Sequence, residues 1–124
     1  MPTILLIEDT PIVREPLARL LRDEGFVILT AADGAEAFDQ LATHPVDLIL
    51  LDVLMPHMDG VRFLESLNGH AKHIPVIAVT GVADSTKLAR LRELGVRSIV
   101  HKVRFTIEML VNEIHLQLGE AVSR

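Results

Sequence analysis

The chain has 124 residues, a net charge of −5 and 49% hydrophobic residues, which predicts one domain with a sizeable core. No apolar run reaches the ~18 residues of a membrane span. The acidic balance argues against direct nucleic-acid binding, and the lack of cysteine excludes thiolate metal sites. The first strand is expected at residue 3, which leaves no room for a signal peptide. We expect a cytoplasmic protein with one domain over residues 1–119, a frayed tail over residues 120–124 and no output domain.

Strand-like and helix-like segments alternate five times along the chain. This alternation predicts an α/β fold, a single doubly wound (βα)5 flavodoxin-like domain with a parallel sheet. The strands are expected at residues 3–7, 26–30, 47–51, 75–80 and 97–101. The first, third and fourth are nearly all apolar, which is typical of central strands, whereas the second and fifth carry more polar residues and are placed at the edges. The sheet order 2-1-3-4-5 brings the ends of the first and third strands together, where open sheets bind ligands.

The first helix is expected over residues 11–24, with Thr10 as its N-cap and Pro11 at its first position. Pro16 lies in the second turn, so either the helix starts late or its first turn is kinked. The spacing of apolar residues predicts a core stripe of Val13, Leu17, Leu20 and Leu21. The next helix follows Asp33-Gly34, and the others are expected at residues 61–67, 85–94 and 106–118.

Acidic residues follow two of the predicted central strands. Glu8 and Asp9 come directly after the first strand, and Asp52 comes directly after the third. A charged group is rarely left at the end of a buried strand without a partner. Hard divalent cations such as Mg²⁺ prefer oxygen ligands, and a cation would offset the repulsion between the carboxylates. The three acids therefore predict a cation site at this edge of the sheet.

Two further residue types suit phosphoryl chemistry at the same edge. Thr80 ends the fourth strand, and Lys102 follows the fifth. A carboxylate can act as a nucleophile toward phosphorus and form an acyl phosphate. The transferred phosphoryl group then needs Mg²⁺, a hydroxyl donor and a cation around its oxygens. Thr80 and Lys102 supply the last two.

Four motifs occur in order and in register with the five strand–helix units. They are Ile7-Glu8-Asp9, the run DVLMPHMDG from Asp52 to Gly60, Val79-Thr80-Gly81, and Lys102. Together they make the chain resemble the receiver domain of two-component response regulators, of the kind that the chemotaxis regulator represents, over roughly residues 2–119. The resemblance implies that Asp52 is the phosphoacceptor and that a sensor histidine kinase or a histidine phosphotransfer protein is the donor.

The same resemblance implies a metal site. Asp9, Asp52 and the Leu54 backbone carbonyl would hold Mg²⁺ (or Mn²⁺), and Glu8 would act through a water molecule. The protein would catalyse its own phosphorylation and slow dephosphorylation without being an enzyme in the ordinary sense.

The resemblance also implies how the signal leaves the site. Thr80 would bond a phosphoryl oxygen and swing inward on activation, and Lys102 would pair with the phosphate or, before phosphorylation, with Asp52. The change of shape would be read by a downstream protein or an output domain.

The chain departs from the family pattern at several positions. Val103 stands where most receivers have a proline with a cis peptide bond, and a cis bond costs ~2.5–4 kcal/mol before a non-proline residue. We therefore expect a trans Lys102-Val103 bond and altered switching. Ile99 replaces the aromatic residue that usually rotates together with the threonine. Leu54 and Val82 are apolar where polar residues influence hydrolysis, so we hypothesise a long-lived phosphate whose half-life exceeds seconds.

The last helix has apolar residues on two sides. Its core stripe is Ile107, Leu110, Val111, Ile114 and Leu118. Phe105, Met109 and Leu116 lie on roughly the opposite side, where polar residues are expected. One explanation is a homodimer or partner surface formed by the helix at 85–94, the strand at 97–101 and the last helix, as in the resembled family. The other is partial cover by neighbouring loops.

Other functions remain open at this stage. A degenerate receiver would act as a phosphorylation-independent interaction module. A haloacid-dehalogenase-like phosphatase needs a second acid two residues after the nucleophile, where this chain has Leu54. A flavodoxin-like cofactor carrier needs a Gly/Ser/Thr-rich phosphate loop, which the acidic loop after the first strand is not. The pair His70 and His73 has no third ligand nearby in the sequence and is interpreted as a surface feature.

Overall fold

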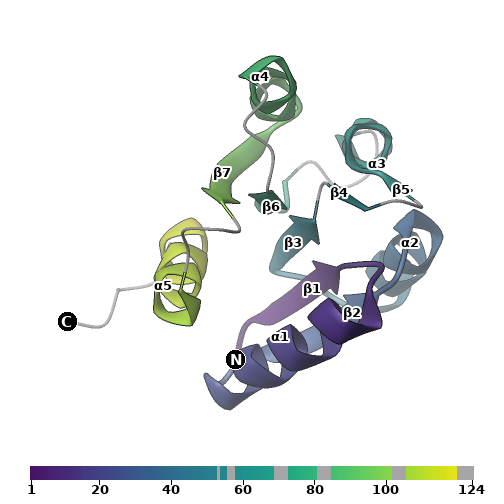
Figure 1. Ribbon diagram of the computed structural model, residues 1–124. Coiled ribbons are helices and arrows are strands. Elements are labelled where there is room, and N and C mark those ends of the chain that lie inside the picture. The colour runs from purple at the N-terminus through teal and green to yellow at the C-terminus, as the bar shows by residue number, and fades with distance from the viewer. Residues whose placement is uncertain (53, 56–57, 69–72, 81–84, 102–105, 120–124) are drawn as a thin grey trace.

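The computed structural model describes residues 1–52, 54–55, 58–68, 73–80, 85–101 and 106–119. Five of its strands form one parallel sheet in the order β2-β1-β3-β6-β7, which confirms the predicted fold and topology (Figure 1). In chain order, the strands of this sheet are β1 (Thr3–Ile7), β2 (Val27–Ala31), β3 (Leu48–Asp52), β6 (Val76–Thr80) and β7 (Val96–His101).

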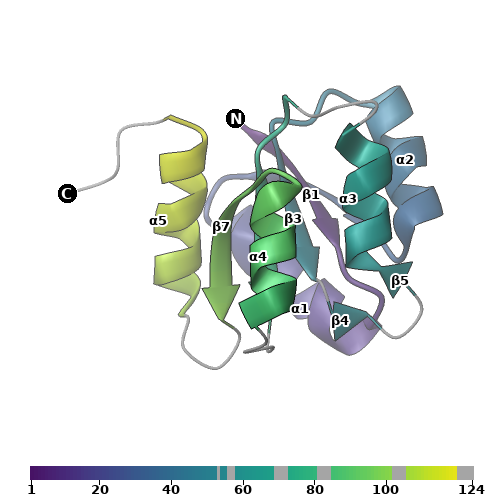
Figure 2. The same ribbon diagram turned by 90° about the horizontal axis from the view of Figure 1, so that it is seen from above.

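The helices form a layer on each face of the sheet (Figures 1 and 2). They are α1 (Pro11–Asp23), α2 (Gly34–Thr43), α3 (Gly60–Asn68), α4 (Ser85–Glu93) and α5 (Ile107–Gln117). Successive strand residues point to opposite faces, so Ile4 and Leu6 of β1 join the core under α1 and α5. Leu5 and Ile7 join the core under α2, α3 and α4. Because both faces are covered, β3 and β6 are apolar except at their carboxyl ends, and β1 is apolar after Thr3.

The predicted core stripe of α1 is wrong in part. Val13 and Leu20 are 43% and 48% exposed, whereas Ala18 and Leu21 are fully buried. Leu17 packs against the same core from a partly buried position. The helix is therefore rotated about its axis relative to the prediction, and its inner face follows residues 14, 17, 18 and 21.

The start of α1 agrees with the sequence, apart from the role of its cap. The helix begins at Pro11, with Thr10 in the N-cap position, so the alternative of a late start is wrong. The Thr10 side chain makes no capping hydrogen bond; its hydroxyl donates to Asp9 Oδ1 at 3.1 Å instead. Pro16 lies within the helix on its exposed side, where water can solvate the Ile12 carbonyl that proline leaves without a helical donor.

A short antiparallel pair between β3 and α3 is absent from the sequence prediction. It consists of β4 (Leu54–Met55) and β5 (Met58–Asp59). The pair lies along the chain between the end of β3 and the start of α3, so Leu54 follows two residues after Asp52. None of the helices in the described ranges is long and apolar enough to cross a membrane.

Candidate phosphoacceptor site

Three buried polar residues lie at one edge of the sheet. Ile7 pairs with Leu51 across β1 and β3, so Glu8 and Asp52 are the next residues of two adjacent strands. Asp52 in turn pairs with Val79 of β6, and Thr80 follows. Their exposed fractions are 4% for Glu8, 3% for Asp52 and 0% for Thr80, and within the described residues these three are the whole set of buried polar or charged residues. The fold thus gathers its buried polar groups at the carboxyl ends of the three central strands.

The loop after β1 is held by a hydrogen bond to β2 and by hydrogen bonds among its own residues. The Glu8 amide continues the sheet by donating to the Ala31 carbonyl at 3.0 Å. The Glu8 carboxylate accepts from the Thr10 amide at 3.2 Å, and the Asp9 carboxylate accepts from the Thr10 hydroxyl at 3.1 Å. Asp9 is half-buried, so it is more accessible to a solvated ion than Glu8 is.

The donor set fits a hard divalent cation. Adjacent strands lie about 4.8 Å apart, so carboxylates at neighbouring strand ends are close enough to repel one another when ionised. Within the part of the chain that is described, no three histidine or acidic side chains already form a metal-holding group. Mg²⁺ needs fewer protein ligands than that, because it keeps several waters and is bound through one or two carboxylates. Leu54, whose carbonyl the resemblance to receiver domains implies as a ligand, lies in β4 two residues after Asp52.

Some of the predicted site residues lie outside the described residues. His101 pairs with Thr80 at the end of β7, so the chain reaches the same edge one residue before Lys102. Lys102, Val103, Phe105 and Val82 themselves are not described. The roles of Lys102 and the geometry of the Lys102-Val103 bond therefore stay predictions.

The sequence analysis did not single out Arg14. Its Nη1 donates to the Glu8 backbone carbonyl at 2.9 Å, and its side chain is only 15% exposed. A charged residue at position 14 is in phase with the inner face of α1 that Leu17, Ala18 and Leu21 form. This position in the helical repeat could have indicated that Arg14 points inward, but the predicted core stripe contained Val13 and not position 14.

The predicted output surface has exposed apolar side chains. Met109 and Leu116 of α5 are 53% and 59% exposed. Ile99 of β7 is partly buried and packs against the core under α2, α3 and α4. The interface through these residues stays a prediction.

The family model of the response regulator receiver domain matches residues 4–115. The chain belongs to this family. The matched range includes the three buried polar residues of the site as well as Asp9 and Lys102. Receiver domains of response regulators work in two-component signalling, where phosphorylation controls them and histidine kinases and output domains are their general partners.

The similar proteins include a response regulator, a sensor histidine kinase and a receiver domain protein. Response regulator RR06 of Streptococcus pneumoniae is 33% identical over 112 residues, which are 90% of this chain and 50% of that protein. The sensor histidine kinase RcsC of Escherichia coli is 37% identical over 99 residues, 80% of this chain and 10% of the kinase. A CheY-like receiver domain protein from Methanospirillum hungatei has the same fold, with a TM-score of 0.88 at 23% identity, covering 96% of this chain and 94% of that one. This chain spans half or less of the two curated relatives.

Proposed function

We propose that this receiver accepts a phosphoryl group on Asp52 from a phosphohistidine and signals by a change of shape. The observation that carries the proposal is the buried set at the carboxyl edge, where a nucleophilic carboxylate lies between a second carboxylate and a hydroxyl. An isolated acid on a protein surface has no second carboxylate and no hydroxyl on neighbouring strands. Burial removes competing water, which strengthens each electrostatic interaction with the transferred group.

The proposed transfer is a single displacement at phosphorus. An oxygen of the Asp52 carboxylate forms a bond to phosphorus while the P–N bond to the donor histidine breaks, and the electron pair returns to the imidazole nitrogen. When bound, Mg²⁺ (or Mn²⁺) neutralises charge on the phosphoryl oxygens. Asp9, Asp52 and the Leu54 carbonyl would hold it, with Glu8 acting through water. The Thr80 hydroxyl would donate to a phosphoryl oxygen, and Lys102 would supply the remaining positive charge.

An apolar surface of this chain lies beside the site, and the donor protein can pack on it. Helix α1 begins two residues after Asp9, and it exposes Ile12 by 85%, Val13 by 43% and Leu20 by 48%. A donor histidine must come within bonding distance of Asp52, so its protein must cover the rim next to α1. We infer that the histidine kinase or phosphotransfer protein packs on these side chains.

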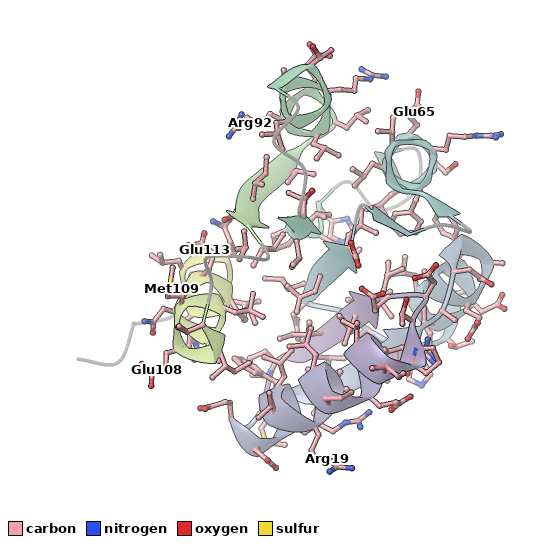
Figure 3. The ribbon with its side chains drawn as sticks, in the orientation of Figure 1. Arg19, Glu65, Arg92, Glu108, Met109 and Glu113 are labelled. Carbon is pink, nitrogen blue, oxygen red and sulfur yellow. The ribbon has the colours of Figure 1, made fainter. Side chains whose placement is uncertain are left out.

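The β7 edge of the sheet suits an output partner or a second copy of the chain. Figure 3 shows Arg92 of α4 and Glu113 and Met109 of α5 on the side where these two helices flank β7. We propose that a two-fold interface pairs Arg92 of one copy with the oppositely charged Glu113 of the other around Met109 and Leu116. The exposed fractions of Met109 and Leu116, 53% and 59%, support a homodimer as one form of the output.

The phosphorylation-independent interaction module is the second candidate, and Ile99 favours it. A packed aliphatic side chain at this position lacks the ring that couples the threonine to the output surface in the resembled family. Incubation with acetyl phosphate and Mg²⁺, followed by intact-mass spectrometry, separates the two functions. The switch predicts one added phosphoryl group in the wild type and none in Asp52→Asn. The interaction module predicts no addition in either protein.

A further inference from the structure

Arg14 reaches back from α1 to the loop that carries the acidic residues. Its Nη1 donates to the Glu8 carbonyl at 2.9 Å. Ile7 is the last β1 residue paired with β2 and β3, so the Glu8 carbonyl lies where the sheet ends. Arg14 is the hydrogen-bond donor that ties this carbonyl to the helix.

The backbone of the loop closes on the same residue. The Thr10 carbonyl accepts from the Arg14 amide at 2.8 Å and from the Val13 amide at 3.0 Å. The Thr10 amide donates to the Glu8 carboxylate at 3.2 Å. The Arg14 side chain thus holds the Glu8 end of the Glu8–Asp9–Thr10 segment, and the backbone of the first turn of α1 holds the Thr10 end. Asp9 lies between the two held residues.

The other contact of Arg14 does not account for its burial. Its Nε lies 3.5 Å from Glu15 Oε1, and the Glu15 side chain is 59% exposed. An ion pair with one partner in solvent contributes little to stability. The whole Arg14 side chain is only 15% exposed, and burying its charged group is costly unless it is hydrogen-bonded; the inward bond to the Glu8 carbonyl meets that need.

We propose that Arg14 is a positioning residue for cation binding at Asp9 and Asp52. It fixes the backbone path of the loop and thereby the place of the Asp9 carboxylate. The proposal rests on the proposed function, in which these carboxylates hold Mg²⁺. The proposal predicts that loss of the Arg14 side chain weakens Mg²⁺ binding. Charge alone predicts the opposite, because a positive charge near a cation site repels the cation. Removing that charge should tighten Mg²⁺ binding if charge dominates, and weaken it if positioning dominates.

The test is a calorimetric titration of Mg²⁺ into the full chain. The chain has no tryptophan or tyrosine, so calorimetry is better suited than intrinsic fluorescence. Arg14→Met keeps the apolar stem and should raise the Mg²⁺ dissociation constant roughly tenfold, the lower end of the range for residues that orient metal ligands. Arg14→Lys keeps the positive charge and an N–H donor group, and its dissociation constant should stay within about threefold of the wild type. Arg19→Met, on the exposed side of the same helix (Figure 3), is the matched control and should leave the constant unchanged.

A kinetic measurement separates positioning from general damage. The rate of phosphorylation by acetyl phosphate is followed as Mg²⁺ is raised. Arg14→Met should need more Mg²⁺ for half its maximal rate and then reach the wild-type maximum. A lower maximum with unchanged half-saturation would overturn the proposal, as would a dissociation constant equal to or below that of the wild type. If Arg14→Met does not fold by circular dichroism, Arg14→Gln takes its place in the same comparison.

The failure of this inference is distinguishable from failure of the proposed function. A wild-type chain that takes up neither Mg²⁺ nor phosphate refutes the proposed function and the role of Arg14 together. A wild type that takes up both, while the Arg14 variants match it, refutes the role of Arg14 alone.

Discussion

Asp52 of β3 pairs with Val79 of β6 in the parallel register of the sheet, and Thr80 is the next residue along β6. Both Asp52 and Thr80 are buried, at 3% and 0% exposed. The register therefore fixes a carboxylate and a hydroxyl on neighbouring strands without any loop between them. Strand-borne groups are held more rigidly than loop-borne ones, which suits the stabilisation of a transferred phosphoryl group.

Replacing Thr80 by valine should slow phosphorylation while leaving the protein folded. Valine has nearly the same shape but no hydroxyl, so the phosphoryl oxygens lose one donor, and we expect a rate loss of roughly tenfold or more. Thr80→Ser keeps the hydroxyl and should retain most of the rate. The measurement is intact mass against time with acetyl phosphate. Equal rates for the valine and serine variants would show that the hydroxyl takes no part.

Neutralising Asp52 should stabilise the chain in the absence of divalent cations. Asp52→Asn removes one of two buried carboxylates at adjacent strand ends, and relief of their repulsion should raise the free energy of unfolding by about 1 kcal/mol, or roughly 4 °C in melting temperature. Thermal melting by circular dichroism in EDTA checks this. A lower melting temperature would mean that favourable interactions of the Asp52 charge outweigh the repulsion.

Mg²⁺ should make the wild type more stable than Asp52→Asn. At about ten times its dissociation constant, the cation should stabilise the wild type by about 1.4 kcal/mol and leave Asp52→Asn nearly unchanged. Asp47→Asn is the matched control, since Asp47 lies just before the opposite end of the same strand and accepts from the Thr3 amide at 2.8 Å. It should respond to Mg²⁺ as the wild type does; an equal response of all three proteins would place the cation elsewhere.

Much of this arrangement was predictable from the sequence, because it depends on strand order. The apolar run Leu48–Leu51 predicts a central strand, and a parallel sheet brings its carboxyl end beside that of β1. The rotation of α1 was not predictable in the same way. The predicted stripe combined Val13 and Leu20 with Leu17 and Leu21, and only the last two face the core. Arg14 lies in phase with them and donates to the Glu8 carbonyl, but a charged residue is not expected on the core side of a helix.

The β4–β5 pair was not predicted from the sequence, for a different reason. Each strand has only two residues, too few to show an alternating pattern, so the pairing of Leu54 with Asp59 gives no signal in the sequence. The position of Leu54 next to the site follows from this pairing as much as from its distance in sequence from Asp52.

The exposed apolar side of α1 should serve the phosphodonor protein and not the chemistry. Ile12→Glu should lower the rate of phosphotransfer from the donor protein at least tenfold, because it places a charge in an apolar contact. The same variant should react with acetyl phosphate at the wild-type rate. Leu116→Glu, an equally drastic change on α5, is the control and should leave both rates unchanged. A parallel loss of both rates in Ile12→Glu would point to damage at the site instead.

The output surface predicts a change in association without a change in folding. Met109→Glu together with Leu116→Glu should yield a folded protein that is more monomeric than the wild type by analytical ultracentrifugation, because two exposed apolar contacts are lost. Unchanged association would count against this interface.

The charges beside that surface allow a sharper experiment. Arg92→Glu and Glu113→Arg should each weaken association, and the two changes in one chain should restore it, because the pair is reversed and not lost. Additive weakening would show that Arg92 and Glu113 do not face one another between copies.

The central claim is that Asp52 is the residue that carries the phosphate. After incubation with acetyl phosphate and Mg²⁺, borohydride reduction converts an aspartyl phosphate to homoserine, which peptide mass spectrometry locates in the chain. We predict homoserine at position 52, dependent on Mg²⁺, with Glu8 and Asp9 unmodified. Modification at another acid, or none in the presence of Mg²⁺, would contradict the account.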